Sequence, residues 1–211
     1  MRPGSLDETI LRFVVAHRSV VATDIARAVM AAGTTPAVLG LLAVVALAVV
    51  VLYRAYRPAG AGVPAVVVAA ILAAELKGAV GRARPPADLA LVSPGGPSFP
   101  STQAAETAAL AVAVVVAVAW GSRAALRAAT WTAGALVLLA GTCMVYLGAH
   151  WPSDVVAGWM LGGAIGAVAG WLARRWSDPG GGPVHSAERG PGHLRSRLRR
   201  VRPGDTTRRQ P

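Results

Sequence analysis

Five long apolar runs constrain this chain more strongly than any other feature of its sequence. They are Pro36–Tyr53, Gly62–Leu76, Ser101–Trp120, Ala128–Leu147 and Val155–Trp171. Each has roughly 15 to 20 residues, close to the length that a helix needs to cross a membrane core of about 30 Å. Only 15% of the residues are charged, whereas soluble domains carry roughly a quarter. The chain is therefore predicted to be all-α, a polytopic membrane helix bundle with about five transmembrane helices.

The segment ahead of these runs, residues 1–34, mixes charged and apolar side chains. Arg12 and Asp24 interrupt its apolar stretches, which is typical of helices that lie in the membrane interface. We expect one or two interfacial helices here, with residues 19–33 as an alternative short buried span. Residues 35–176 then form the transmembrane domain.

The final segment, residues 177–211, is rich in Pro, Gly and Arg. It cannot bury enough apolar surface to offset the entropy lost on ordering, so we expect a disordered tail. Ten of the 21 basic residues lie after Ala173, and the net charge of +11 owes much to them. Such a tail is expected to lie near anionic lipid headgroups. Nucleic-acid binding is not expected, because the arginines are not interleaved with aromatic residues.

The basic residues between the runs predict an orientation. Five spans place the Arg54/Arg57 pair, the Arg123/Arg127 pair and the tail on one side of the membrane. The positive-inside rule makes that side cytoplasmic. We therefore expect a multi-pass protein of the plasma membrane whose polar segments face outward.

Glycines recur at every fourth position of the last apolar run, at Gly158, Gly162, Gly166 and Gly170. This spacing puts them on one helix face, where a second helix can approach closely. We expect the face to pack inside the bundle; a homodimer through it is the alternative.

Three polar segments fall on the predicted outer side: 77–85, 98–103 and 145–154. They combine cations, a hydroxyl before a predicted helix, and a His–Asp pair four residues apart. Cations and helix N-termini both favour a phosphoryl group. No role follows for four further polar residues, which we expect in solvated loops: Arg82, Asp88, Ser93 and Ser98.

These segments resemble the three motifs of the PAP2 superfamily, the type 2 phosphatidic acid phosphatases, which run K-x6-RP, PSGH and SR-x5-H-x3-D. The resemblance covers about residues 5–175. It implies that Lys77 and Arg84 bind phosphate oxygens, with Ser101 and Thr102 beside them. Ser101 is also expected to cap the helix that follows it. It also implies that His150 is a nucleophile that forms a phosphohistidine, and that Asp154 orients its ring and stabilises the imidazolium. The resemblance implies no metal or other cofactor.

Four positions depart from the family motifs. Thr102-Gln103 stands where the family has Gly-His, which removes the histidine that protonates the leaving oxygen, and Cys143-Met144 replaces a Ser-Arg pair, which removes a phosphate-binding arginine. Losing general-acid help costs about 10²- to 10⁴-fold in rate. Glu106, one turn after Gln103, is a candidate substitute acid; a structural bond to a neighbouring helix or cation is the alternative.

The resemblance and its departures together predict a membrane phosphatase with weakened activity on lipid phosphates. Isoprenoid-type diphosphates are the favoured substrates, because a phosphate leaving group needs protonation less than an alkoxide does. The alternative is an inactive PAP2-like protein that binds lipid phosphate headgroups or a membrane partner.

Overall fold

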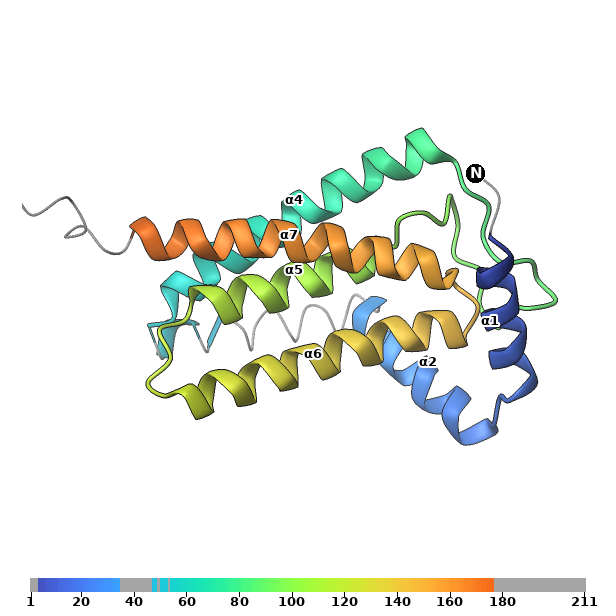
Figure 1. Cartoon of the computed structure of the whole chain (residues 1–211), viewed down its shortest axis with the longest axis horizontal. Coiled ribbons are helices and arrows are strands. Elements are labelled where there is room, and N and C mark those ends of the chain that lie inside the picture. Colours follow the sequence, from blue (N-terminus) through green and yellow to red (C-terminus); the bar gives the residue numbers. More distant parts are fainter. Residues whose placement is uncertain (1–3, 35–46, 49, 53, 177–211) are drawn as a thin grey trace, which may run out of the picture. The chain divides into compact units, whose positions relative to one another are not determined.

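The computed structural model describes residues 4–34, 47–48, 50–52 and 54–176, and the part of the chain that it describes is helical, without strands. Figure 1 labels six helices: α1 (Ser5–Ala16), α2 (Val20–Thr34), α4 (Tyr56–Val80), α5 (Thr102–Ala117), α6 (Arg123–Tyr146) and α7 (Pro152–Trp176). The predicted all-helical membrane bundle is confirmed. Most of the first apolar run, Pro36–Tyr53, and all of the predicted tail lie outside the described residues.

Within the described residues, three helices are long and apolar enough to cross a membrane: α4, α6 and α7. α4 extends the predicted run at both ends and has 25 residues. α5 has 16 residues and is apolar but shorter. Large apolar side chains such as Val67, Leu136 and Val168 are exposed on these helices, as expected for surfaces that face lipid. The number of spans, about five, stays a prediction.

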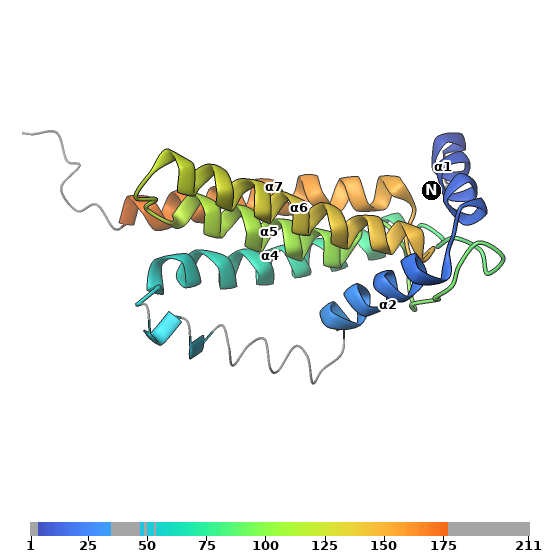
Figure 2. The same ribbon diagram turned by 90° about the horizontal axis from the view of Figure 1, so that it is seen from below.

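The core of the bundle is the packing of α5 against its neighbours. α5 contacts α4, α6 and α7, and these four helices run side by side (Figure 2). Alanines dominate the interface, with Ala69, Ala105, Ala109 and Ala113 fully buried. Small side chains allow the helix backbones to approach closely, which is how apolar helices gain packing energy in lipid.

The glycine ladder of α7 lies in this interface. A Cβ atom added at Gly158 would meet the carbonyl oxygen of Ser101 at 2.6 Å, and one added at Gly166 would meet that of Ala109 at 2.5 Å. The ladder therefore serves internal packing, as expected. The alternative use in a homodimer would need a face that α5 already covers.

The two N-terminal helices are joined to the rest of the bundle by hydrogen bonds. Arg18, between α1 and α2, donates to the carbonyl oxygen of Tyr146 at 2.9 and 2.7 Å and to that of Leu89 at 2.8 Å. Tyr146 is the last residue of α6, where carbonyl groups lack intrahelical partners and a cation is favourable. Residues 4–34 thus form two helices, and Arg18 anchors their junction.

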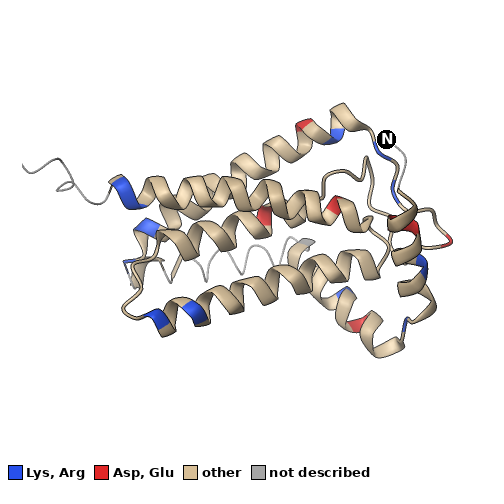
Figure 3. Ribbon diagram, viewed as in Figure 1, with Lys and Arg blue, Asp and Glu red and all other residues tan. Residues whose placement is uncertain are grey.

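Charged residues lie mostly toward the helix ends (Figure 3). Arg174, in the last turn of α7, donates to the carbonyl oxygen of Val118, just after α5. The start of α6, with Arg123, follows within a few residues. The basic residues of α6 and α7 therefore gather at the end of the bundle opposite the start of α7.

The close contact at Gly162 predicts a stability difference between two adjacent glycines. A Cβ atom at Gly162 would overlap the backbone of Ala105, whereas one at Gly163 would meet nothing within 4 Å. Gly162→Ala should lower the free energy of unfolding by about 1–3 kcal/mol through overpacking. Gly163→Ala is the matched control and should leave it unchanged or raise it by up to about 1 kcal/mol. Unfolding in detergent measures both; equal effects would contradict the packing described.

Candidate active site

The three predicted polar segments meet at the end of the bundle where α4 ends and α5 and α7 begin. The amide of Ser101 donates to the carbonyl oxygen of Asp154 at 2.9 Å, which joins the starts of α5 and α7 directly. The amide of Ser98 donates to the carbonyl oxygen of Arg82 at 2.8 Å, which folds the loop after α4 back on itself. The close α5–α7 packing thus places all three segments together.

His150 and Asp154 are held by the turn between α6 and α7. Gly148 adopts a positive φ of 74° there, a conformation that suits glycine. His150 is 7% exposed and Asp154 is fully buried. Asp154 Oδ2 accepts from the amide of Trp151 at 2.9 Å and lies 3.5 Å from His150 Nδ1. Nδ1 therefore faces the carboxylate at ion-pair distance, without a hydrogen bond to any of the described residues.

Arg84 approaches the other nitrogen of the imidazole. Its Nη1 lies 3.2 Å from His150 Nε2 and donates to the carbonyl oxygen of Ala149 at 2.6 Å. Arginine is only a donor, so Nε2 must be the acceptor in this contact. This assigns the tautomer of His150 with its proton on Nδ1, facing Asp154.

Lys77 lies in the last turn of α4, where its Nζ donates to the carbonyl oxygen of Pro97 at 3.0 Å. Burial lowers the pKa of His150 below its ordinary value, and the charges of Arg84 and Lys77 lower it further, against the opposing effect of Asp154. The imidazole is therefore neutral at pH 7, as a nucleophile requires.

Ser101 occupies the predicted cap position, but its hydroxyl has a second partner. Ser101 Oγ accepts from the amide of Ala104 at 3.4 Å and donates to the sulfur of Met144, also at 3.4 Å. Ser101 and Met144 are both buried. Met144, which replaces the family's arginine, thus accepts a hydrogen bond from the Ser101 hydroxyl that was expected to donate to phosphate.

The other departing positions lie in apolar packing or along α5. Cys143 is buried with Ala26 and Leu147. Thr102 opens α5 and is half-buried. A Cβ atom added at Gly33 in α2 would meet the side-chain nitrogen of Gln103, and Glu106 is half-buried one turn further along α5.

Two residues that we expected in solvated loops are buried, so that prediction is wrong for them. Arg82 is 3% exposed and Ser98 is fully buried; Asp88 and Ser93 are exposed, as expected. Arg82 Nη1 donates to Asp154 Oδ1 at 2.6 Å, and Ser98 Oγ donates to the carbonyl oxygen of Ala83 at 3.1 Å. No local pattern in the sequence signals this burial, because it depends on partners that the fold brings to Arg82 and Ser98.

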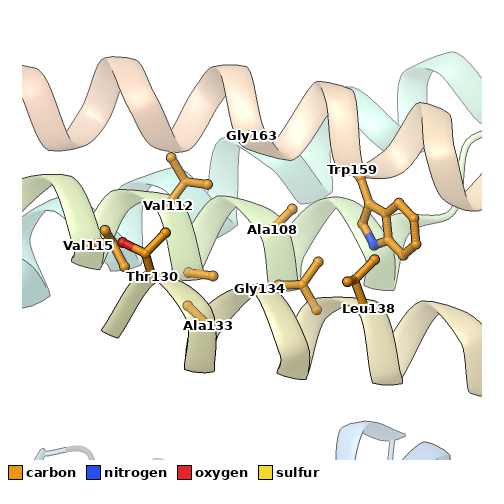
Figure 4. Close-up of a pocket in the computed structure, with 11 residues that line it drawn as sticks. Ala108, Val112, Val115, Thr130, Ala133, Gly134, Leu138, Trp159 and Gly163 are labelled. Atoms are coloured by element: carbon orange, nitrogen blue, oxygen red, sulfur yellow. The ribbon is translucent and has the colours of Figure 1, made fainter. Parts of the chain in front are cut away.

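An apolar cavity of about 490 Å³ lies between α5, α6 and α7 (Figure 4). Val112, Leu138 and Trp159 are among the residues that line it. Its lining suits hydrocarbon rather than phosphate, so it is distinct in character from the polar cluster around His150.

Sequence and structure comparisons identify the family. The family model of the PAP2 superfamily matches residues 37–178. A similar solved structure is the first transmembrane PAP2-type phosphatidylglycerolphosphate phosphatase, from Bacillus subtilis, with a TM-score of 0.66 and 23% identity over 82% of this chain and 85% of that chain. Another is Aquifex aeolicus LpxE, with a TM-score of 0.62 and 21% identity over 82% of this chain and 96% of that chain. No curated protein matches the chain in sequence.

At these identities the two solved structures establish a shared fold. The family match covers more than half of the 211 residues and includes all three motif segments. The chain therefore belongs to the PAP2 superfamily, as its motifs predicted.

Proposed function

We propose that the chain is a membrane phosphohydrolase that cleaves lipid phosphates or diphosphates, with His150 as the nucleophile. The observation that carries this proposal is the environment of the imidazole. Its Nδ1 faces Asp154, its Nε2 accepts from Arg84, and its pKa lies below the ordinary value. A neutral histidine with an orienting carboxylate and an adjacent cation suits attack on phosphorus.

In the first step, the Nε2 lone pair attacks the terminal phosphorus and the bond from phosphorus to the leaving oxygen breaks. The phosphoryl oxygens accept hydrogen bonds from Arg84 and Lys77 in place of their present partners. Asp154 stabilises the positive charge that develops on the ring. In the second step, water attacks the phosphorus, the bond from phosphorus to Nε2 breaks, and the water protons leave with the inorganic phosphate, so that His150 returns to its neutral form.

The leaving group determines which substrates this site can use. A glutamine at position 103 cannot supply a proton to an alkoxide, while a phosphate departs from a diphosphate without one. We therefore infer that isoprenoid-type diphosphates are cleaved more readily than monophosphates. The solved structure named for phosphatidylglycerolphosphate supports lipid phosphates as the general class. The loss of an arginine at position 144, and the engagement of Ser101 with Met144, support weakened turnover.

A second candidate function is binding of lipid phosphate headgroups without turnover. The observation that favours it is the same Ser101–Met144 hydrogen bond, which occupies a hydroxyl expected at the phosphate. Lys77 and Arg84 would still attract the anion. Either function is proposed for a plasma membrane protein with this site outside and the tail in the cytoplasm, on the basis of the positive-inside rule.

Phosphate release from two lipids with the same chain tests the proposal and its substrate preference. Purified protein should release phosphate faster from farnesyl diphosphate than from farnesyl monophosphate, and His150→Ala should reduce both to the level of the blank.

Gln103→His combined with Met144→Arg should raise the rate on the monophosphate by about 10²- to 10⁴-fold, because it restores the acid. A wild type indistinguishable from His150→Ala would contradict turnover and favour headgroup binding.

The lowered pKa of His150 predicts the acidic side of the pH profile. The neutral ring is the active form, and its folded-state pKa lies below the ordinary value of 6.5. Activity should therefore persist as pH falls to 6.5 and decline only below it, as read from kcat/KM, which reports the free enzyme. Profiles with a monophosphate and a diphosphate separate ionisation of the enzyme from that of the substrate. An acidic decline of kcat/KM that belongs to the enzyme and has an apparent pKa at or above 6.5 would contradict the environment assigned to His150.

A further inference from the structure

A buried ionic cluster lies behind the His150–Asp154 pair, on the side away from Arg84. Arg82 Nη1 donates to Asp154 Oδ1 at 2.6 Å, and Arg82 Nη2 donates to Asp7 Oδ2 at 2.5 Å. All three side chains are at least nine-tenths buried. Asp7 comes from α1, Arg82 from the loop after α4 and Asp154 from α7, so the cluster joins three separate segments.

Ser153 also connects Asp7 to the first turn of α7, and its hydroxyl accepts from Arg82 Nη1 at 2.7 Å. Its amide donates to Asp7 Oδ1 at 2.9 Å and its hydroxyl donates to Asp7 Oδ2 at 2.7 Å. Burial alone would raise the pKa of Asp7, but the hydrogen bonds from Ser153 and Arg82 outweigh it and hold the pKa below its ordinary value. Asp7 is therefore ionised at pH 7. It is hydrogen-bonded to Ser153, the residue next to Asp154.

The two oxygens of Asp154 have separate partners as a result. Oδ1 accepts from Arg82, while Oδ2 accepts from the amide of Trp151 and faces His150. A carboxylate held through both oxygens cannot rotate, so the plane presented to His150 is fixed. Arg82 Nη2 in turn needs an acceptor, because a buried donor without a hydrogen-bond partner is costly. Asp7 supplies that acceptor.

We propose that Asp7 and Arg82 are positioning residues of this site, which hold Asp154 against His150 and set the charge that the imidazole experiences. The inference rests on the proposed function and extends it to a part of the chain that the family match does not include. That match begins at residue 37, whereas Asp7 lies in α1. The N-terminal helix therefore contributes to the site.

Asp7→Asn tests the inference, because asparagine keeps the shape of aspartate and removes its charge. It should lower kcat by about 10- to 100-fold through misplacement of Asp154, while KM stays within about twofold because Asp7 is not a phosphate-binding group. Glu8→Gln is the matched control. It removes the same charge from the same helix, but Glu8 is 48% exposed and pairs with the exposed Arg12. Its kcat and KM should equal those of the wild type.

The pKa of His150 gives a readout that a purely structural role would not change. The charged groups that face it are Asp154, Arg84 and Lys77, with Arg82 and Asp7 behind Asp154. Removing the negative charge of Asp7 leaves Arg82 less neutralised, so the pKa of His150 should fall further in Asp7→Asn. Titration by NMR of the histidine ring signals measures it, with His150→Ala to assign the resonance. Glu8→Gln should cause no shift.

Ser153→Ala keeps the experiment decisive if Asp7→Asn does not fold. It removes one hydroxyl shared by Arg82 and Asp7 but leaves both ion pairs, so it should reduce kcat in the same direction by a smaller factor. The inference is overturned if Asp7→Asn, or Ser153→Ala in its place, matches Glu8→Gln in kcat. It is also overturned if Asp7→Asn folds and is less active than the wild type, but the pKa of His150 in it equals that of the wild type.

Failure of the proposed function gives a different result. In that case the wild type shows no turnover above His150→Ala, while the NMR titration still reports whether Asp7 sets the charge at His150.

Discussion

The close packing of α5 on α7 is the constraint on which the rest of this site depends. Glycines on α7 bring its backbone against the carbonyl groups of Ser101 and Ala109. That approach aligns the starts of the two helices, so that the amide of Ser101 bonds the carbonyl oxygen of Asp154. In lipid, where apolar surface gains nothing by leaving its surroundings, contact of this kind is a main source of helix association. The glycine face is therefore structural, and the site geometry is its consequence.

The cations around His150 divide into two groups with different partners. Arg82 lies between two carboxylates, Asp7 and Asp154, which compensate its charge within the protein. The hydrogen-bond partners of Arg84 and Lys77 are backbone carbonyl oxygens and the imidazole, which are neutral. Exchanging a neutral acceptor for a phosphoryl oxygen strengthens a hydrogen bond. An anion is therefore favoured on the Nε2 side of the ring, whereas the orienting carboxylate of Asp154 lies on the Nδ1 side.

Features that depend on local periodicity were predictable from the sequence. Apolar runs located α4 to α7 to within a turn or two, the four-residue spacing of Gly158 to Gly170 predicted a packed face, and Ser101 was expected as a cap. Features that depend on pairing across the chain were not. Asp7 and Arg82 are 75 residues apart, and no local pattern marks either as buried. The hydrogen bond from Ser101 to Met144 likewise depends on helix packing that no motif encodes.

Trapping the phosphohistidine tests most directly whether phosphorus becomes bonded to His150. An isoprenoid diphosphate labelled in its terminal phosphate would be mixed with the protein, quenched in alkaline detergent and analysed for label on peptides. Label on His150, stable to base and lost in acid, is the predicted result, with none in His150→Ala. Release of phosphate without label on His150, or label that persists in His150→Ala, would contradict the account.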